Sequence, residues 1–139
     1  MLEKIHDHIT NELQQTARTD IVFVVTSVLF NLIVLGINSA VASSAVSEKS
    51  NSSDDFVLFI FIFMVIMVNT IAMVAMRTGK NTRNRLLEGL IAMYKDNDVD
   101  KYYNSTILSN YSKRNFLFTA VIVCLFITSI AVPIVIRFI

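Results

Sequence analysis

The sequence predicts an all-α integral membrane protein with three transmembrane helices. Of its 139 residues, 54% are hydrophobic and only 17% are charged, which is more apolar than is usual for a soluble domain. The apolar residues are concentrated in three blocks, residues 21–46, 56–76 and 116–136, and none of these contains Asp, Glu, Lys or Arg. Each block is long enough to span a bilayer as a helix. Together they occupy about half of the chain, so we expect one membrane domain and no second domain of ordinary size.

Residues 1–20 predict an amphipathic helix that precedes the first span. Leu2, Ile5, Ile9 and Leu13 recur at intervals of three or four, which places them on one narrow face. A narrow apolar stripe favours packing against a helical partner. The same region carries more acidic than basic side chains, whereas the N-terminal region of a cleavable signal peptide is short and positively charged. The first block is therefore expected to be a transmembrane helix of the mature protein and not a signal peptide that is cleaved off.

The distribution of basic residues predicts the orientation. Eight Lys and Arg residues lie in the polar segment 77–114, whereas the loop 47–55 contains only Lys49. Basic residues accumulate on the cytoplasmic side of a membrane. We therefore expect the segment 77–114 and the N-terminus to be cytoplasmic and the C-terminus to be outside. The expected location is the cell membrane, inner or plasma, as a multi-pass protein.

The segment 77–114 is predicted to form a cytoplasmic helical hairpin between the second and third spans. Residues 79–82, Gly-Lys-Asn-Thr, combine a helix-weakening glycine with two residues that favour helix N-caps, so a new helix is expected to start there. Residues 83–95 predict an amphipathic helix because their apolar side chains fall on one side. After the polar stretch 96–100, residues 101–111 are expected to form the second helix of the hairpin.

No set of side chains predicts catalysis, a metal site or a cofactor, and we expect the protein not to be an enzyme. The only cysteine, Cys124, lies inside the third block, beyond the reach of either histidine. Residues 96–100, Asp-Asn-Asp-Val-Asp, match the start of an EF-hand loop, but Lys101 and Ile107 replace its required glycine and glutamate. The formal net charge of +1 provides no field that would attract nucleic acid.

Polar side chains within the spans are candidates for function, because an unpaired amide or hydroxyl is costly in hydrocarbon. Ser27, Asn31 and Asn38 share one face of the first span, whereas Asn69 and Thr128 lie near the middle of the other two. Asn31, Asn69, Cys124 and Thr128 are expected to lie at a similar depth, where they could meet in one layer. Two interpretations stay open: these side chains hold helices together, or they line a wet path in an assembly of several copies.

A second candidate surface lies just after the second span. Four basic residues lie there: Arg77, Lys80, Arg83 and Arg85. Either they serve only to fix the orientation of the chain in the membrane, or they contact anionic lipid or a partner protein. The apolar residues of the following helix, Leu87, Leu90 and Ile91, are the candidates for contact with a partner protein.

The sequence favours a non-enzymatic membrane protein that self-associates as an ion-conducting or membrane-permeabilising pore, because three short spans cannot enclose a cavity alone. Its expected partners are the lipid bilayer and further copies of the chain. The alternative is a membrane anchor or regulatory subunit that docks a membrane or cytosolic protein through the segment 77–114. Neither function requires a cofactor or nucleic acid.

Overall fold

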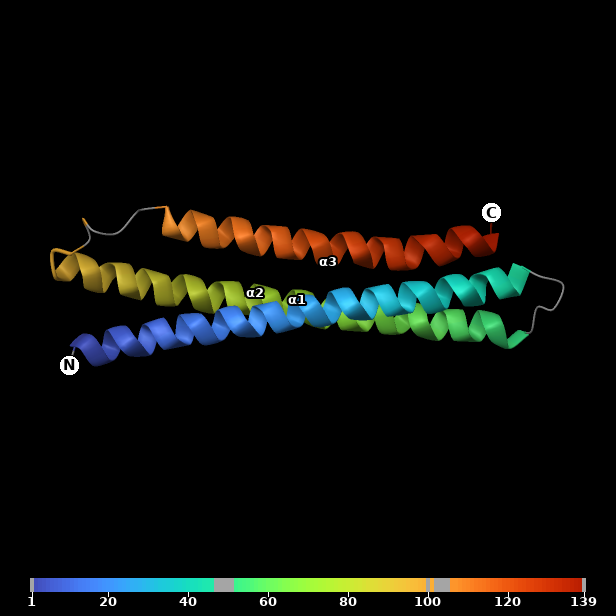
Figure 1. The fold of residues 1–139 in the computed structure, drawn as a ribbon, viewed down its shortest axis with the longest axis horizontal. Coiled ribbons are helices and arrows are strands. Elements are labelled where there is room, and N and C mark those ends of the chain that lie inside the picture. Colours follow the sequence, from blue (N-terminus) through green and yellow to red (C-terminus); the bar gives the residue numbers. More distant parts are fainter. Residues whose placement is uncertain (1, 47–51, 100, 102–105, 139) are drawn as a thin grey trace.

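The computed structural model describes residues 2–46, 52–99, 101 and 106–138, and these contain three helices and no strand. Helix α1 is Leu2–Val46, α2 is Ser52–Asp96 and α3 is Ile107–Phe138. Figure 1 shows α1 and α2 running antiparallel, with α3 parallel to α1. The all-α prediction is confirmed, and all three helices are long and apolar enough to cross a membrane.

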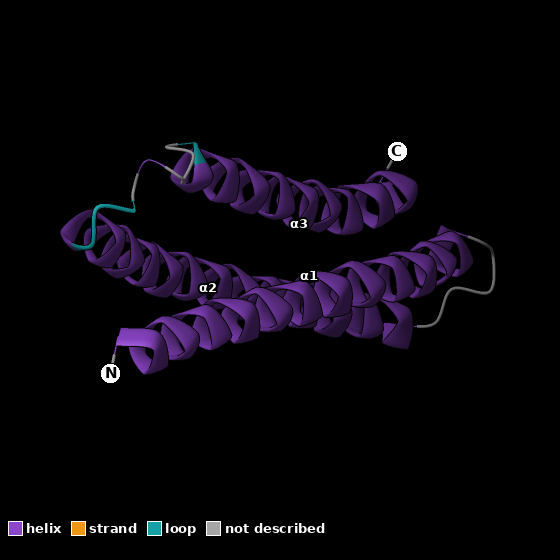
Figure 2. Cartoon of the chain, turned by 60° about the vertical axis from the view of Figure 1, so that its left-hand side comes forward, coloured by secondary structure: helices purple, strands orange, loops and turns teal. Residues whose placement is uncertain are grey.

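The start of α1, the end of α2 and the start of α3 lie at one end of the molecule, and the C-terminus lies at the other (Figure 1). Turning the molecule shows α1 crossing α2 near their middles, with α3 along one side (Figure 2). The start of α1 and the parts of α2 and α3 that belong to the segment 77–114 therefore lie at the same end of the bundle.

Helix α2 passes through residues 79–82 without a break, so the predicted helix start at that point is wrong. The reason is the packing of this part of α2 against α1. A Cβ atom at Gly79 would lie 2.5 Å from Oδ1 of Asp20 in α1, so the glycine allows α1 and α2 to approach closely. A glycine lowers helix propensity by only about 1 kcal/mol, which packing along a long helix outweighs.

The predicted hairpin is also different in its details. Residues 83–95 are the end of α2, and residues 107–111 are the first turns of α3, so they form no separate pair of helices. Residues 102–105 of the predicted second helix lie outside the described residues. The predicted N-terminal helix is continuous with the first span in α1. Of the predicted loop 47–55, residues 52–55 belong to α2, and 47–51 lie outside the described residues.

Within the three apolar blocks, large hydrophobic side chains point outward. Phe59 is 74% exposed, and Ile33, Val74 and Leu117 are also largely exposed. The side chains enclosed between the helices there include asparagines and serines. Apolar side chains such as Val34, Val65 and Ile122 are buried beside them. The extensive exposed apolar surface is what differs from a water-soluble protein, and it matches a protein whose surroundings are apolar.

Beyond the apolar blocks, the helices form an extension that we call the stalk: residues 2–20, 77–96 and 107–115. At 1.5 Å per residue, the α1 part is about 28 Å long. The stalk contains an apolar core of its own, in which Leu13 of α1 is buried against Leu87, Leu90 and Tyr94 of α2. For Ile9 and Leu13 of the N-terminal stripe the helical partner is thus α2 of the same chain, whereas Ile5 is 44% exposed.

Candidate functional site: polar contacts inside the bundle

The most completely bonded polar site is a pair of asparagines that joins α1 to α2. Nδ2 of Asn31 donates to Oδ1 of Asn69, and Nδ2 of Asn69 donates to Oδ1 of Asn31, both at 2.9 Å. Each amide also donates at 2.8 Å to a carbonyl one turn back in its own helix, that of Ser27 or Val65. Both asparagine residues are 0% exposed. The pair therefore uses its donors entirely within one chain.

The third helix joins this layer through Ser129. Its hydroxyl donates to the backbone carbonyl of Asn31 at 3.1 Å, and its side chain is buried. The predicted residue, Thr128, instead donates to the carbonyl of Cys124 in its own helix at 2.9 Å. Thr128 lies on a partly exposed face, so the expected meeting of Thr128 with Asn31 is not found.

A signal for Ser129 is present in the sequence. Asn115, Ile122 and Ser129 recur every seven residues, and all three are buried. A seven-residue spacing marks the face that long helices present to one another when they pack at a small angle. Cys124 and Thr128, the small and polar residues near the middle of the third span, lie on a neighbouring face on which Cys124 is exposed.

Asn38 differs from Asn31 in its bonding. It is fully buried one heptad further along α1, yet neither Nδ2 nor Oδ1 has a hydrogen-bond partner among the residues that the structure describes. A buried amide without partners costs about 1–3 kcal/mol. Ser27 is also buried. The predicted polar face of Ser27, Asn31 and Asn38 is therefore enclosed between the three helices and does not line the outer surface.

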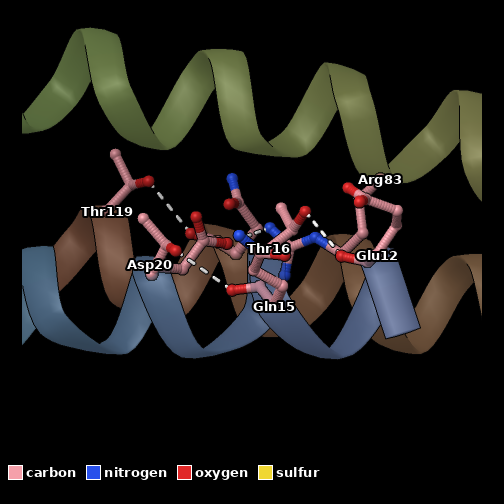
Figure 3. A network of polar contacts seen from close by, with 8 residues as sticks. Glu12, Gln15, Thr16, Asp20, Arg83 and Thr119 are labelled. Carbon is pink, nitrogen blue, oxygen red and sulfur yellow. Dashed lines mark hydrogen bonds and ion pairs between the residues drawn. The ribbon is translucent and has the colours of Figure 1, made fainter. Parts of the chain in front are cut away.

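A buried ion pair lies where the apolar blocks meet the stalk. Nη2 of Arg83 in α2 donates to Oδ2 of Asp20 in α1, and both side chains are at least 96% buried, with 3% and 4% exposed. Figure 3 shows both residues at the contact between the helices. The absence of a side chain at Gly79 makes room for the carboxylate. Arg83, predicted to contact lipid or a partner, is thus engaged inside the chain.

Asp20 precedes the first apolar block and lies outside it. Burial raises the pKa of its carboxyl group, and the positive charges of Arg83 and Arg114 oppose that rise. Arg83 and Arg114 also flank the ring of Tyr111, with Cζ atoms 5.9 and 4.9 Å from the ring centre. The pairing of Asp20 with Arg83 was not predicted. Its sequence signal is the seven-residue spacing of Leu13, Asp20 and Ser27.

The other predicted contact residues are divided between the surface and the stalk core. Arg77 and Arg85 are exposed, and Lys80 is partly buried. Leu87 and Leu90 are buried against α1, whereas Ile91 is 38% exposed. Only part of the predicted partner surface is therefore accessible.

Two further contacts join the helix ends. At the far end of the stalk, Nε2 of His6 and the hydroxyl of Tyr94 are 2.8 Å apart and link α1 to α2. At the opposite end of the molecule, Nε of Arg137 donates to Oδ1 of Asp55 at 3.0 Å and links α3 to α2. The described residues include no group of three or more His, Cys, Asp or Glu side chains that could hold a metal ion.

No protein-family model, curated protein or solved structure matches this chain.

Proposed function

We propose that the chain is a non-enzymatic integral protein of the cell membrane that acts as an anchor or regulatory subunit, with its stalk as the docking element. One observation carries the proposal: α1 and α2 continue without a break from the apolar blocks into the stalk and pack there around a core of their own. Binding surfaces are best held on rigid elements, and this stalk is already ordered in the single chain. The excess of basic residues in 77–114 supports a cytoplasmic stalk.

The asparagine pair supports this proposal more than it supports a pore. Asn31 and Asn69 satisfy each other, and Ser129 bonds to the same layer. Such contacts are the usual means by which membrane helices hold together. A pore lined by Asn31 would require the three helices to separate and the amide hydrogen bonds to be exchanged for water.

Burial decides which part of the stalk is available to a partner. Because Leu87 and Leu90 form the stalk core, the accessible face of α2 is the outward one. That face carries four exposed residues at intervals of three or four: Arg85, Glu88, Ala92 and Lys95. Ile91 lies beside them. A mixture of both charges with one apolar side chain is suited to a reversible protein contact.

Site-specific photocrosslinking in cells that express the full chain tests this proposal. A photoreactive residue at Ala92, on the exposed stalk, is expected to capture a protein other than a second copy of the chain. The same residue at Phe59, on the apolar exterior, is the matched control and is expected to capture lipid. Adducts of Ala92 that contain only lipid or a second copy would contradict the docking role.

The second candidate is the self-associating pore, and the unpartnered amide of Asn38 favours it. A buried amide without a partner gains hydrogen bonds if the helices part and water enters. In this proposal several copies assemble, and contacts between the helices of one chain are replaced by contacts between copies. Ser27, Asn31 and Asn38 then line a water-filled path for ions.

Ion flux from liposomes that contain the purified protein separates the two functions. The anchor is expected to be silent at protein densities where its insertion is verified. The pore conducts, loses conductance in Asn38→Leu, and keeps it in Thr70→Leu, which changes an exposed hydroxyl on α2. Conductance with this mutational pattern would overturn the anchor proposal.

A further inference from the structure

Basic side chains surround the junction between the stalk and the apolar blocks on all three helices. We call this set the basic collar: Arg18, Arg77, Lys80, Lys113 and Arg114. Arg83 lies inside the collar with its charge paired to Asp20. At the opposite end, the described charged residues are Asp54, Asp55 and Arg137, which have a net negative charge. The two ends of the apolar region therefore differ in the sign of their charge.

Arg114 is the most unusual member of the collar. It forms no ion pair or hydrogen bond with any described residue, and its Nε is buried without a partner. Its guanidinium lies over the ring of Tyr111, with Cζ 4.9 Å from the ring centre. The nearby carboxylate of Asp20 is already bonded to Arg83. The guanidinium of Arg114 is thus near a carboxylate that is already paired, and it rests on Tyr111 without an ion pair of its own.

The surface next to Arg114 is strongly apolar. Phe116 and Leu117, the first two residues of the third block, are 71% and 62% exposed. A fixed cation beside exposed hydrocarbon is complementary to a molecule with an anionic head and acyl chains. A guanidinium also matches the geometry of phosphate oxygens through paired N–H donors.

We propose that Arg114 is a binding site for the phosphate of an anionic phospholipid, with Tyr111 positioning the guanidinium and Phe116 and Leu117 contacting the acyl chains. The remainder of the collar adds longer-range attraction for anionic headgroups. This site replaces Arg83, which the sequence suggested for lipid contact and which is buried in its ion pair. The inference rests on the proposed membrane insertion and is independent of whether the stalk docks a partner.

Native mass spectrometry of the full chain, released from nanodiscs that contain phosphatidylglycerol and phosphatidylcholine, tests the site. We expect retained phosphatidylglycerol on the unmodified protein and a loss of about tenfold or more in Arg114→Gln, as for a charge-assisted hydrogen bond. Lys113→Gln removes an adjacent exposed charge and is the matched control, with an expected loss of about fivefold or less. Equal helical content and equal phosphatidylcholine binding verify that the variants are folded.

Arg114→Lys separates a specific site from diffuse attraction, because it keeps the charge and removes the planar donor fork. The proposal expects Arg114→Lys to lose more phosphatidylglycerol than Lys113→Gln does. Wild-type binding by Arg114→Lys would overturn the proposal and leave only a diffuse collar. Competition by inorganic phosphate at the concentration of the lipid would also overturn it, by indicating a site for soluble anions.

Flotation with phosphatidylcholine vesicles makes failure of the site distinguishable from failure of the proposed function. A chain that does not float contradicts membrane insertion and, with it, both proposals. A chain that floats without preference for phosphatidylglycerol contradicts only the lipid site.

Discussion

The apolar blocks and the stalk are built from the same three helices, yet the side chains that face outward differ in polarity between the two regions. In the blocks, Asn31 and Asn69 are enclosed while phenylalanines such as Phe59 point outward. In the stalk, Leu13 and Leu87 are enclosed while charged side chains point outward. Burying apolar surface is favourable only where the surroundings are water. The difference in the outward-facing side chains is therefore what we expect if the surroundings change from hydrocarbon to water along each helix.

The seven-residue spacing of the buried residues in α1 continues unchanged across the junction between the stalk and the apolar blocks. Leu13, Asp20, Ser27 and Val34 recur every seven residues along α1, and all four are buried. One buried face of α1 thus contributes Leu13 to the stalk core, Asp20 to the ion pair, and Ser27 and Val34 to the interior of the apolar blocks. The pair of Asp20 and Arg83 lies at the transition, where a buried charge can still be compensated by a partner from the adjacent helix.

The largest expected effect comes from breaking the ion pair at the junction of the two regions. Arg83→Met or Asp20→Leu leaves an unpaired buried charge and should destabilise the bundle by about 3–5 kcal/mol. The double variant Asp20→Leu/Arg83→Met leaves no charge behind, so its cost is expected to be well below the sum of the two. SDS-induced unfolding in mixed micelles measures all three. Additive costs would contradict direct coupling between the two side chains.

A smaller effect is expected from loosening the stalk core alone. Leu87→Ala removes a buried side chain and should cost about 2–5 kcal/mol. Hydrogen–deuterium exchange is expected to rise in residues 2–20 and to stay low in the apolar blocks. Ile91→Ala, on the partly exposed side of the same helix, is the control and should change stability by about 0.5 kcal/mol. Uniform loss of protection would show that the two regions unfold as one unit.

The smallest expected changes in stability come from substitutions at two glycines of α2, and the two substitutions are expected to have opposite signs. Gly79→Ala places a Cβ atom 2.5 Å from Oδ1 of Asp20 and should destabilise the junction. Gly89→Ala meets open space in a helix interior and should stabilise the protein by about 0.5–1 kcal/mol. The same unfolding titration measures both variants. Stabilisation by both would contradict the close approach at Gly79.

The sequence by itself determined the composition of each region. Three blocks without charged residues require three apolar helices, because their backbone groups must be paired internally in hydrocarbon. The N-terminal spacing of Ile9 and Leu13 required a helical partner, and Leu87 and Leu90 required burial. These inferences follow from residue type and periodicity, which are properties of one helix considered alone.

Tertiary structure decided how the helices use those residues. Residues 79–82 have the local signals of a helix boundary, but contact with Asp20 makes Gly79 part of an unbroken helix. Arg83 resembles a lipid-facing cation until α1 brings a carboxylate to it. Ser129, and not its neighbour Thr128, bonds to Asn31 because α3 presents that face to α1. Local preferences are worth about 1 kcal/mol per residue, whereas a buried contact depends on a second helix that the local sequence does not specify.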